Sequence, residues 1–341
     1  MAVTTTDEIN DLVWLQPQWQ QLITAHQNQR LAHAYLFYSR QDLGVVSCLQ
    51  HLANYLLCSS SGSDKPCGQC QHCYLCQQGY HPDCYVIEGD SNAMIKIDTV
   101  RLIQEQTYQT RQLGAYQIFI IPQADRLNQA ASNALLKILE EPPDNTLFLL
   151  QTQHLHSLLP TVISRCQLIQ CLAPDSATLK DWASRHCAYK DDQDWELLSR
   201  LADFSPLVLK ELLEGEQLTQ RQACFKAFYQ FTLGQATLAQ TVESLTEKQL
   251  KLQLQYLYSW VQDVIKLQQG ASDDQLTNYD LVEQLQTVGK WVDSKALFNF
   301  VDLLQQYWQY VQLSYNINSR LALENILLAW RNRIQHNKVK R

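Results

Sequence analysis

Residues 118–143 read IFIIPQADRLNQAASNALLKILEEPP, an apolar run that leads into an amphipathic helix and ends in two prolines. The first four residues are continuously apolar, which is typical of a strand buried on both faces of a parallel sheet. Residues 129–141 carry apolar side chains at spacings of three and four, and Pro142 and Pro143 end the helix that this spacing predicts. The stretch therefore predicts one strand followed by one helix.

The same alternation extends on both sides of this stretch. Further apolar runs occur at 34–38, 85–87, 147–150 and 167–171, with helical patterns between them at 49–57 and 98–110. Alternating strands and helices predict an α/β fold with a doubly wound parallel sheet. After residue 174 the strand pattern ends, and helical periodicity continues. We predict an α/β domain over 1–172, a small helical domain over 173–214 and an all-α domain over 215–341.

Composition and charge narrow the class of protein. The 341 residues are 46% hydrophobic and 18% charged, with a formal net charge of -7. An acidic chain is poorly suited to binding DNA alone, because such binding depends on neutralising phosphates. No apolar run approaches the ~20 residues of a membrane span, and residues 1–18 lack the basic start and apolar core of a signal peptide. These features predict a cytoplasmic protein with no membrane partner.

Five of the eleven cysteines lie within residues 58–76. Four of them, Cys58, Cys67, Cys70 and Cys73, supply the number of thiolates that a closed tetrahedral zinc site needs. The turn at Pro66-Cys67-Gly68 allows these close neighbours to converge on one ion. We therefore predict a module over about 58–76 that binds one structural Zn2+.

Alternative ligand sets for this module stay open. Cys76 continues the three-residue spacing and is a candidate to replace Cys58, while His72 and His81 are candidate nitrogen ligands. An iron–sulfur cluster is a further alternative, because residues 67–73 match the first three ligands of a bacterial ferredoxin run. The closing Cys-x3-Cys-Pro of that run is absent here.

The first predicted strand leads into the place where a phosphate-binding loop would lie. Residues 39–46 read SRQDLGVV, beginning with Ser39. Of the phosphate-loop pattern GxxxxGK[ST], only Gly44 remains. Val45 stands where a lysine would reach the terminal phosphates, and Val46 stands where a hydroxyl would hold magnesium. We therefore predict a degenerate loop with no bound nucleotide and no ATP hydrolysis.

The strand at 118–121 lacks the acidic residues that would bind magnesium and activate water at its end. Pro122 and Gln123 follow it directly, and Asp125 is the nearest carboxylate. A lone aspartate before a helix is typical of a helix cap, which is how we interpret Asp125. This strand end also predicts that the chain has no ATPase activity of its own.

Three segments together resemble the clamp-loader branch of the AAA+ ATPases. They are Asn133–Lys137 (NALLK), Leu139–Pro143 (LEEPP) and Ser164–Cys166 (SRC), within a resemblance that covers about residues 20–210. The lost phosphate loop with a retained SRC is similar to the delta-prime subunit family of bacterial DNA polymerase III, and the four cysteines resemble that family's zinc module. The resemblance implies a RecA-like AAA+ sheet, a small helical lid domain and an all-α collar for oligomerisation.

The resemblance also implies a function and partners. Members of this family are non-catalytic subunits of a clamp loader that belongs to a DNA-directed DNA polymerase, a nucleotidyltransferase. The clamp loader is a hetero-pentameric ring with the ATPase subunits gamma/tau and the delta subunit, and it loads the sliding clamp onto primed DNA. The alternative is an AAA+ ATPase that uses an unconventional nucleotide loop.

In the family, the arginine of the SRC motif is an arginine finger, delivered in trans to ATP held by a neighbouring subunit. That role falls here on Arg165, with Ser164 and Cys166 positioning it. A guanidinium suits this role because it is permanently charged, planar and able to bind two phosphate oxygens. Thr152 lies where active members sense the γ-phosphate, and residues 204–207 (FSPL) hold no arginine where motor subunits carry one.

Overall fold

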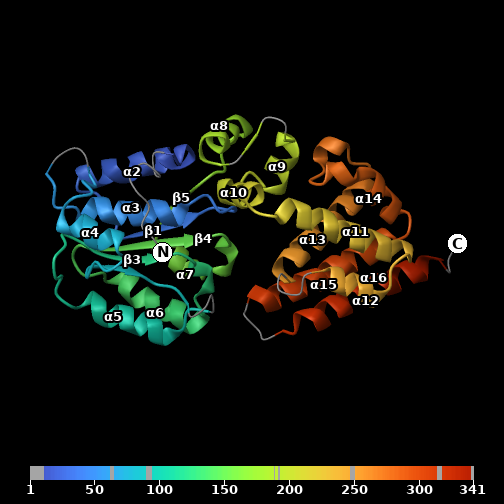
Figure 1. The fold of residues 1–341 in the computed structure, drawn as a ribbon. Helices are drawn as coiled ribbons and strands as arrows, with labels where there is room; N and C mark the ends of the chain where they lie inside the picture. The colour runs from blue at the N-terminus through green and yellow to red at the C-terminus, as the bar shows by residue number, and fades with distance from the viewer. Residues whose placement is uncertain are drawn as a thin grey trace. The chain divides into compact units, whose positions relative to one another are not determined.

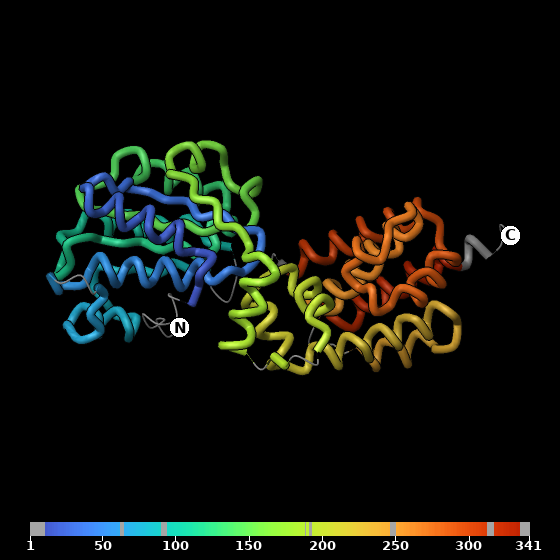
Figure 2. The backbone as a smooth tube through the Cα atoms, turned by 90° about the horizontal axis from the view of Figure 1, so that it is seen from above, coloured from blue at the N-terminus to red at the C-terminus, as the bar shows by residue number. Residues whose placement is uncertain are grey.

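The computed structural model describes residues 11–61, 65–89, 94–187, 189–190, 193–245, 250–312 and 317–338. The chain divides into two compact units, each of which is visible from two directions in Figures 1 and 2. The first unit is Met1–His186 with Phe204–Val208, and the second is Cys187–Asp203 with Leu209–Arg341. Among the described residues, none of the helices combines the length and apolar character that crossing a bilayer requires.

The first unit is built on a five-stranded parallel sheet. Its strands are β1 (Ala34–Tyr38), β2 (Cys84–Val86), β3 (Gln117–Ile121), β4 (Thr146–Thr152) and β5 (Gln167–Gln170), in the spatial order β2-β3-β4-β1-β5. In the register of the sheet, Leu36 of β1 is paired with Leu150 on one side and with Leu168 on the other. All five predicted strands are present, so the prediction of a parallel α/β sheet is confirmed.

Helices cover both faces of this sheet (Figure 1). They are α2 (Gln16–Gln27), α3 (Val45–Leu57), α4 (Gln71–Gln77), α5 (Ile97–Thr107), α6 (Gln129–Glu140), α7 (Pro160–Ile163) and α8 (Ser176–His186), with the short 3-10 helices η1 (Val13–Leu15), η3 (Ala124–Arg126) and η4 (Leu155–Ser157). Side chains of α5, α6 and α7 form one apolar core with alternate residues of β1, β3 and β4. Helix α3 packs on the opposite face, against β3 and β4. The sheet is therefore doubly wound, as predicted.

Helix α6 begins and ends at residues with clear physical roles. The side chain of Asn128 accepts a hydrogen bond from the Ala131 amide at 2.7 Å, which caps the first turn. The helix ends at Glu140, one residue earlier than predicted and shortly before Pro142. The interpretation of Asp125 as the cap is wrong, because Asp125 lies in η3 and accepts a hydrogen bond from the Thr152 hydroxyl instead.

Every element of regular secondary structure among the described residues of the second unit is a helix. Its elements are α9 (Trp195–Leu201), α11 (Gln217–Leu233), α12 (Leu238–Ser244), α13 (Leu250–Gln268), η6 (Asp273–Gln275), η7 (Tyr279–Leu281), α14 (Val282–Gly289), α15 (Ser294–Gln312) and α16 (Ser319–Lys338). Trp260 and Trp330 are both buried in its core, and the ring of Phe228 contacts both indoles. A buried aromatic core of this kind supplies much of a domain's stability.

A buried polar network fixes the segment between α13 and α14. Arg221 of α11 donates two hydrogen bonds of 2.8 Å to the carboxylate of Asp280 and one to Asn278. Asn278 donates in turn to Asp263, a fully buried carboxylate of α13 that also accepts from Lys266. Because each buried charge has partners, the network can be stable in the interior.

The predicted helical segment 173–214 is divided between the two units. Helix α8 lies in the first unit and α9 in the second, and residues of α10 (Pro206–Glu214) are assigned to both. The boundaries at 172 and 214 stay predictions.

Candidate functional site

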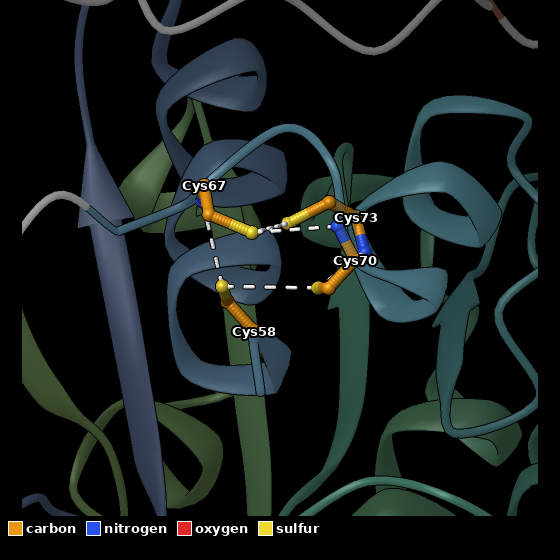
Figure 3. Close-up of side chains that lie close together, drawn as sticks. All are labelled: Cys58, Cys67, Cys70 and Cys73. Atoms are coloured by element: carbon orange, nitrogen blue, oxygen red, sulfur yellow. Dashed lines mark hydrogen bonds between the residues drawn. The ribbon is translucent and has the colours of Figure 1, made fainter. Parts of the chain in front are cut away.

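Four cysteine side chains from three segments meet beside the sheet (Figure 3). Cys58 directly follows α3, Cys67 lies in the following loop, Cys70 caps the start of α4 and Cys73 lies in the first turn of α4. All four Sγ atoms lie within 4.8 Å of one another. Two of the Sγ pairs, Cys58 with Cys70 and Cys67 with Cys73, are separated by 3.9 Å.

These distances fit a tetrahedral ion held by thiolates. A Zn–S bond of ~2.3 Å places the sulfurs of a regular tetrahedron about 3.8 Å apart. Backbone amides donate to the sulfurs as well, since the N–H groups of Cys67, Cys70 and Cys73 lie 3.4 Å from the Sγ atoms of Cys58, Cys67 and Cys70, respectively. Hydrogen bonds to a thiolate stabilise its charge, so the donor set suits a divalent soft metal such as zinc.

Burial and hydrogen bonding shift the pKa values of Cys67, Cys70 and Cys73. Amide donors, that of Gln69 first, lower the pKa of Cys67. Burial opposes ionisation of Cys70, but the Cys73 amide and the donors of Ser59 outweigh it and lower the pKa of Cys70 to about 5. Burial raises the pKa of Cys73. Metal binding requires all four thiolates, so an ion here would have to displace the proton of Cys73.

Gly68 lets the loop turn between the two halves of the site. Its φ of +70° lies in the left-handed region, which glycine adopts without a steric penalty. A Cβ atom at this position would meet nothing within 4 Å, so the backbone conformation alone favours glycine. The turn brings Cys67 back toward Cys58, as the sequence had suggested.

The other candidate ligands lie outside the group of four. Cys76 is buried in α4 and is absent from that group, and burial raises its pKa to about 12. His81 accepts a hydrogen bond at Nδ1 from the Asp83 amide, so its Nε2 carries the proton and donates to Nδ1 of His72 at 2.9 Å. Both ring nitrogens of His81 are therefore engaged. The geometry favours Cys58 over Cys76 as the fourth ligand.

Asp83, which the sequence analysis did not single out, joins the segment after α4 to the loop before β3. Its carboxylate accepts hydrogen bonds from the amides of Gln112, Leu113 and Gly114 at 2.6–2.8 Å. Burial opposes its ionisation, but the three amides outweigh this effect and lower the pKa of Asp83. A Cβ atom at Gly114 would lie 2.5 Å from a methyl group of Leu57 and 3.0 Å from the Tyr116 carbonyl oxygen, so the close approach favours glycine.

The degenerate loop after β1 is packed against other segments of the first unit. Gly44 has a φ of +74°, and a Cβ atom there would lie 3.2 Å from the side chain of Leu12. The indole of Trp14 donates a hydrogen bond of 2.9 Å to the Leu43 carbonyl, and the Ser205 hydroxyl donates one of 2.6 Å to the Asp42 carbonyl. Two of the three consecutive residues 42–44 thus accept hydrogen bonds from side chains distant in sequence, and Leu12 lies beside the third.

The predicted loop residues are themselves largely hidden. Ser39 and Val45 are buried, and Val46 is half-buried at the start of α3. Thr152 is fully buried and bonded to Asp125 at 3.2 Å and to the His154 amide at 3.0 Å. These bonds occupy the hydroxyl that active AAA+ members are expected to turn toward a phosphate.

Arg165 lies between α7 and β5, with its guanidinium at the surface. Its side chain is 34% exposed and forms an ion pair with Glu140, the last residue of α6. One guanidinium nitrogen also donates to the Thr161 carbonyl at 3.0 Å, and the Ser164 hydroxyl donates to the same carbonyl. Cys166 packs against the apolar core, and burial raises its pKa to about 12. Within the SRC motif, Ser164 and Cys166 are therefore held by the first unit, whereas the side chain of Arg165 is partly exposed.

Known protein families match both halves of the chain. Residues 14–175 match the family described as "DNA polymerase III, delta subunit", and residues 215–332 match its C-terminal counterpart. The DNA polymerase III subunit delta' of Pseudomonas aeruginosa is 30% identical over 318 residues, which cover 93% of this chain and 96% of that protein. The subunit delta' of Escherichia coli is 29% identical, with 95% of each chain covered.

A solved structure shares the fold. The DNA polymerase III gamma subunit-related protein of Thermotoga maritima matches with a TM-score of 0.51 and 19% identity, over 92% of this chain and 99% of that one. Identity at this level supports similarity of fold alone. On the sequence relatives and the family matches, this chain belongs to the family of DNA polymerase III delta' subunits.

Proposed function

We propose that this chain is a non-catalytic subunit of the DNA polymerase III clamp loader. The relatives named DNA polymerase III subunit delta' match this chain over almost their whole length. This match supports a role beside the other subunits of that polymerase. The partners would be the ATPase subunits gamma/tau and the delta subunit in a hetero-pentameric ring. Through this ring the chain would help to load the sliding clamp onto primed DNA.

The observation that carries the proposal is that the degenerate loop at residues 42–46 is covered by other side chains, whereas the side chain of Arg165 is partly exposed. The Gly44 amide, one of the N–H groups that a phosphate-binding loop would need open, donates to the Asp42 carboxylate at 3.4 Å. The side chains of Leu12, Trp14 and Ser205 also lie against residues 42–44. The lysine and the hydroxyl of that loop are also replaced, by Val45 and Val46. These features support a subunit that hydrolyses no ATP.

Arg165 is the group that would act in trans. The guanidinium is partly exposed and lies on a turn whose other residues are anchored to the first unit. Placed against ATP of a neighbouring subunit, it would bind phosphate oxygens and stabilise the charge that develops in the transition state. An arginine supplied in this way is worth roughly 10³–10⁵ in rate.

One zinc ion would hold the cysteine module together. Cys58, Cys67, Cys70 and Cys73 would be its ligands and would tie the end of α3 to the start of α4. With four protein ligands the ion has no open position for a substrate, which is typical of a structural site.

The experiment is reconstitution of the complex with its ATPase and clamp-opening subunits, with Arg165→Ala compared with the parent. We expect normal assembly and a loss of about 10³-fold or more in hydrolysis at the neighbouring site. Arg101→Ala is the matched control, because Arg101 is an exposed arginine of the same unit with an ion pair to Asp98. Equal hydrolysis by parent and Arg165→Ala would remove Arg165 from the mechanism.

The isolated chain tests the alternative of an unconventional ATPase. We expect no ATP turnover above a buffer blank. Turnover that is abolished by a substitution in residues 42–46 would contradict the non-catalytic assignment.

A further inference from the structure

We propose that Glu140 is a positioning residue for Arg165. The Glu140 carboxylate holds the Arg165 guanidinium until a phosphate bound by the neighbouring subunit takes the place of the carboxylate. The inference rests on the proposed trans action of Arg165. Its basis is the ion pair between the Arg165 guanidinium and the Glu140 carboxylate, which joins the SRC turn to the end of α6.

The place of Glu140 in its helix favours this pairing. Glu140 is the last residue of α6, where the helix dipole presents its negative end, so a carboxylate there gains from a nearby cation. The Glu140 side chain is 48% exposed and the Arg165 side chain 34% exposed, so both side chains can be reached from solvent. The pair lies at the surface, where an exchange of partners requires no unfolding.

The other contacts of Arg165 do not compete with a phosphate in the same way. The Thr161 carbonyl takes one N–H of the guanidinium, which has five such donors. A neutral carbonyl also leaves the positive charge uncompensated. Glu140 differs because it supplies a full negative charge and an anionic oxygen, which is the chemistry that a phosphate oxygen offers.

The charges determine the direction of the effect. With Glu140 in place the pair presents no net charge to a neighbour, and an approaching phosphate also meets the like charge of the carboxylate. Neutralising Glu140 removes both effects and leaves the cation free. Because displacement comes before the chemical step, Glu140 should raise the ATP concentration needed for half-maximal hydrolysis and leave the maximal rate unchanged.

The test uses Glu140→Gln in the reconstituted complex, with ATP hydrolysis measured as a function of ATP concentration. Exposed ion pairs are weak and salt-sensitive, so we expect the half-saturating ATP concentration to fall about two- to five-fold at low salt. The gain should shrink as salt is added, and the maximal rate should stay as in the parent. Glu141→Gln is the matched control, because it removes the same charge one residue away, at an exposed position.

The variant is repeated in the Arg165→Ala background. There Glu140→Gln should change nothing, because its only route of action is gone. A parent-like ATP dependence of Glu140→Gln, an equal effect of Glu141→Gln, or an effect that persists without Arg165 would overturn the role of Glu140. If Arg165→Ala itself hydrolyses ATP like the parent, the proposed trans action fails as well, and the two failures are thus distinguishable.

Discussion

Replacing Cys58 with alanine should remove the metal, whereas replacing Cys76 should leave it bound. The two residues form a matched pair, because both are buried cysteines, 4% and 6% exposed, in the same module. Each substitution loses one buried sulfur and its packing, a loss of about 1 kcal/mol. Only Cys58 lies within 4.8 Å of the other three sulfurs, so the difference between the variants isolates the effect of the metal.

The size of that difference follows from linkage between binding and folding. An ion that binds only the folded chain, at free concentrations of 100 to 1,000 times its Kd, stabilises the fold by about 2.7–4.1 kcal/mol. For a unit of this size, each 1 kcal/mol corresponds to about 2–4 °C in the melting temperature. Cys58→Ala should therefore melt roughly 5–15 °C below Cys76→Ala when zinc is present.

The assays are metal content by mass spectrometry and thermal melting with and without a chelator. We expect about one zinc per chain in the parent and in Cys76→Ala and none in Cys58→Ala. In the chelator the two variants should melt at the same temperature, about 2–4 °C below the parent, because each still lacks one buried sulfur. Full zinc in Cys58→Ala with its loss in Cys76→Ala would refute the ligand set. Bound iron and the visible absorbance of a cluster would refute zinc itself.

Three further changes test the surrounding structure. Asp83→Asn should destabilise the fold by about 1–3 kcal/mol at neutral pH. Because the pKa of Asp83 is lowered in the folded state, the stability that its carboxylate contributes is present above the unfolded pKa near 4 and is lost as the pH falls through the folded-state pKa. The melting temperatures of parent and variant should therefore converge in acid. Arg221→Ala should cost about 3–5 kcal/mol, because it leaves the Asp280 carboxylate without its bidentate partner, and urea unfolding followed by tryptophan fluorescence measures this. Gly44→Ala should cost about 1–2 kcal/mol, because alanine disfavours a φ of +74° and its methyl group would press on Leu12; thermal melting checks this, and an unchanged melting temperature would show that the loop relaxes.

Local patterns were sufficient to predict the sheet. The apolar runs at 34–38 and 118–121 were visible because strands buried on both faces need no polar residue, and both became central strands. Helix α6 was predicted because the helical spacing of its apolar residues and the two prolines that follow it lie in one continuous stretch of sequence. Its cap was misassigned, since Asn128 and Asp125 lie three residues apart and only the hydrogen bonds distinguish them.

The candidate site was predictable only where its residues are close in sequence. The four cysteines were found because they lie within sixteen residues and one side-chain chemistry identifies them. The contacts of Trp14 with Leu43, of Ser205 with Asp42 and of Asp83 with the 112–114 loop join residues 29 to 163 positions apart. No local pattern predicts such pairs, because the tertiary fold alone brings them together.

The pairing of Arg165 with Glu140 was hidden for the same reason. Both residues stand in recognised motifs, but nothing in either motif shows that the end of α6 faces the turn before β5. The sequence therefore suggested a role for Arg165, but its ion pair with Glu140 became visible only in the structure.

The measurement that tests the central claim most directly is ATP hydrolysis by the full complex in which this chain alone carries Arg165→Lys. Lysine keeps the positive charge but not the planar fork that binds two phosphate oxygens, so the complex should assemble normally and lose most of the hydrolysis at the site that this chain faces. Hydrolysis at the parent's rate would contradict the claim that this subunit, without a nucleotide site of its own, completes the site of its neighbour.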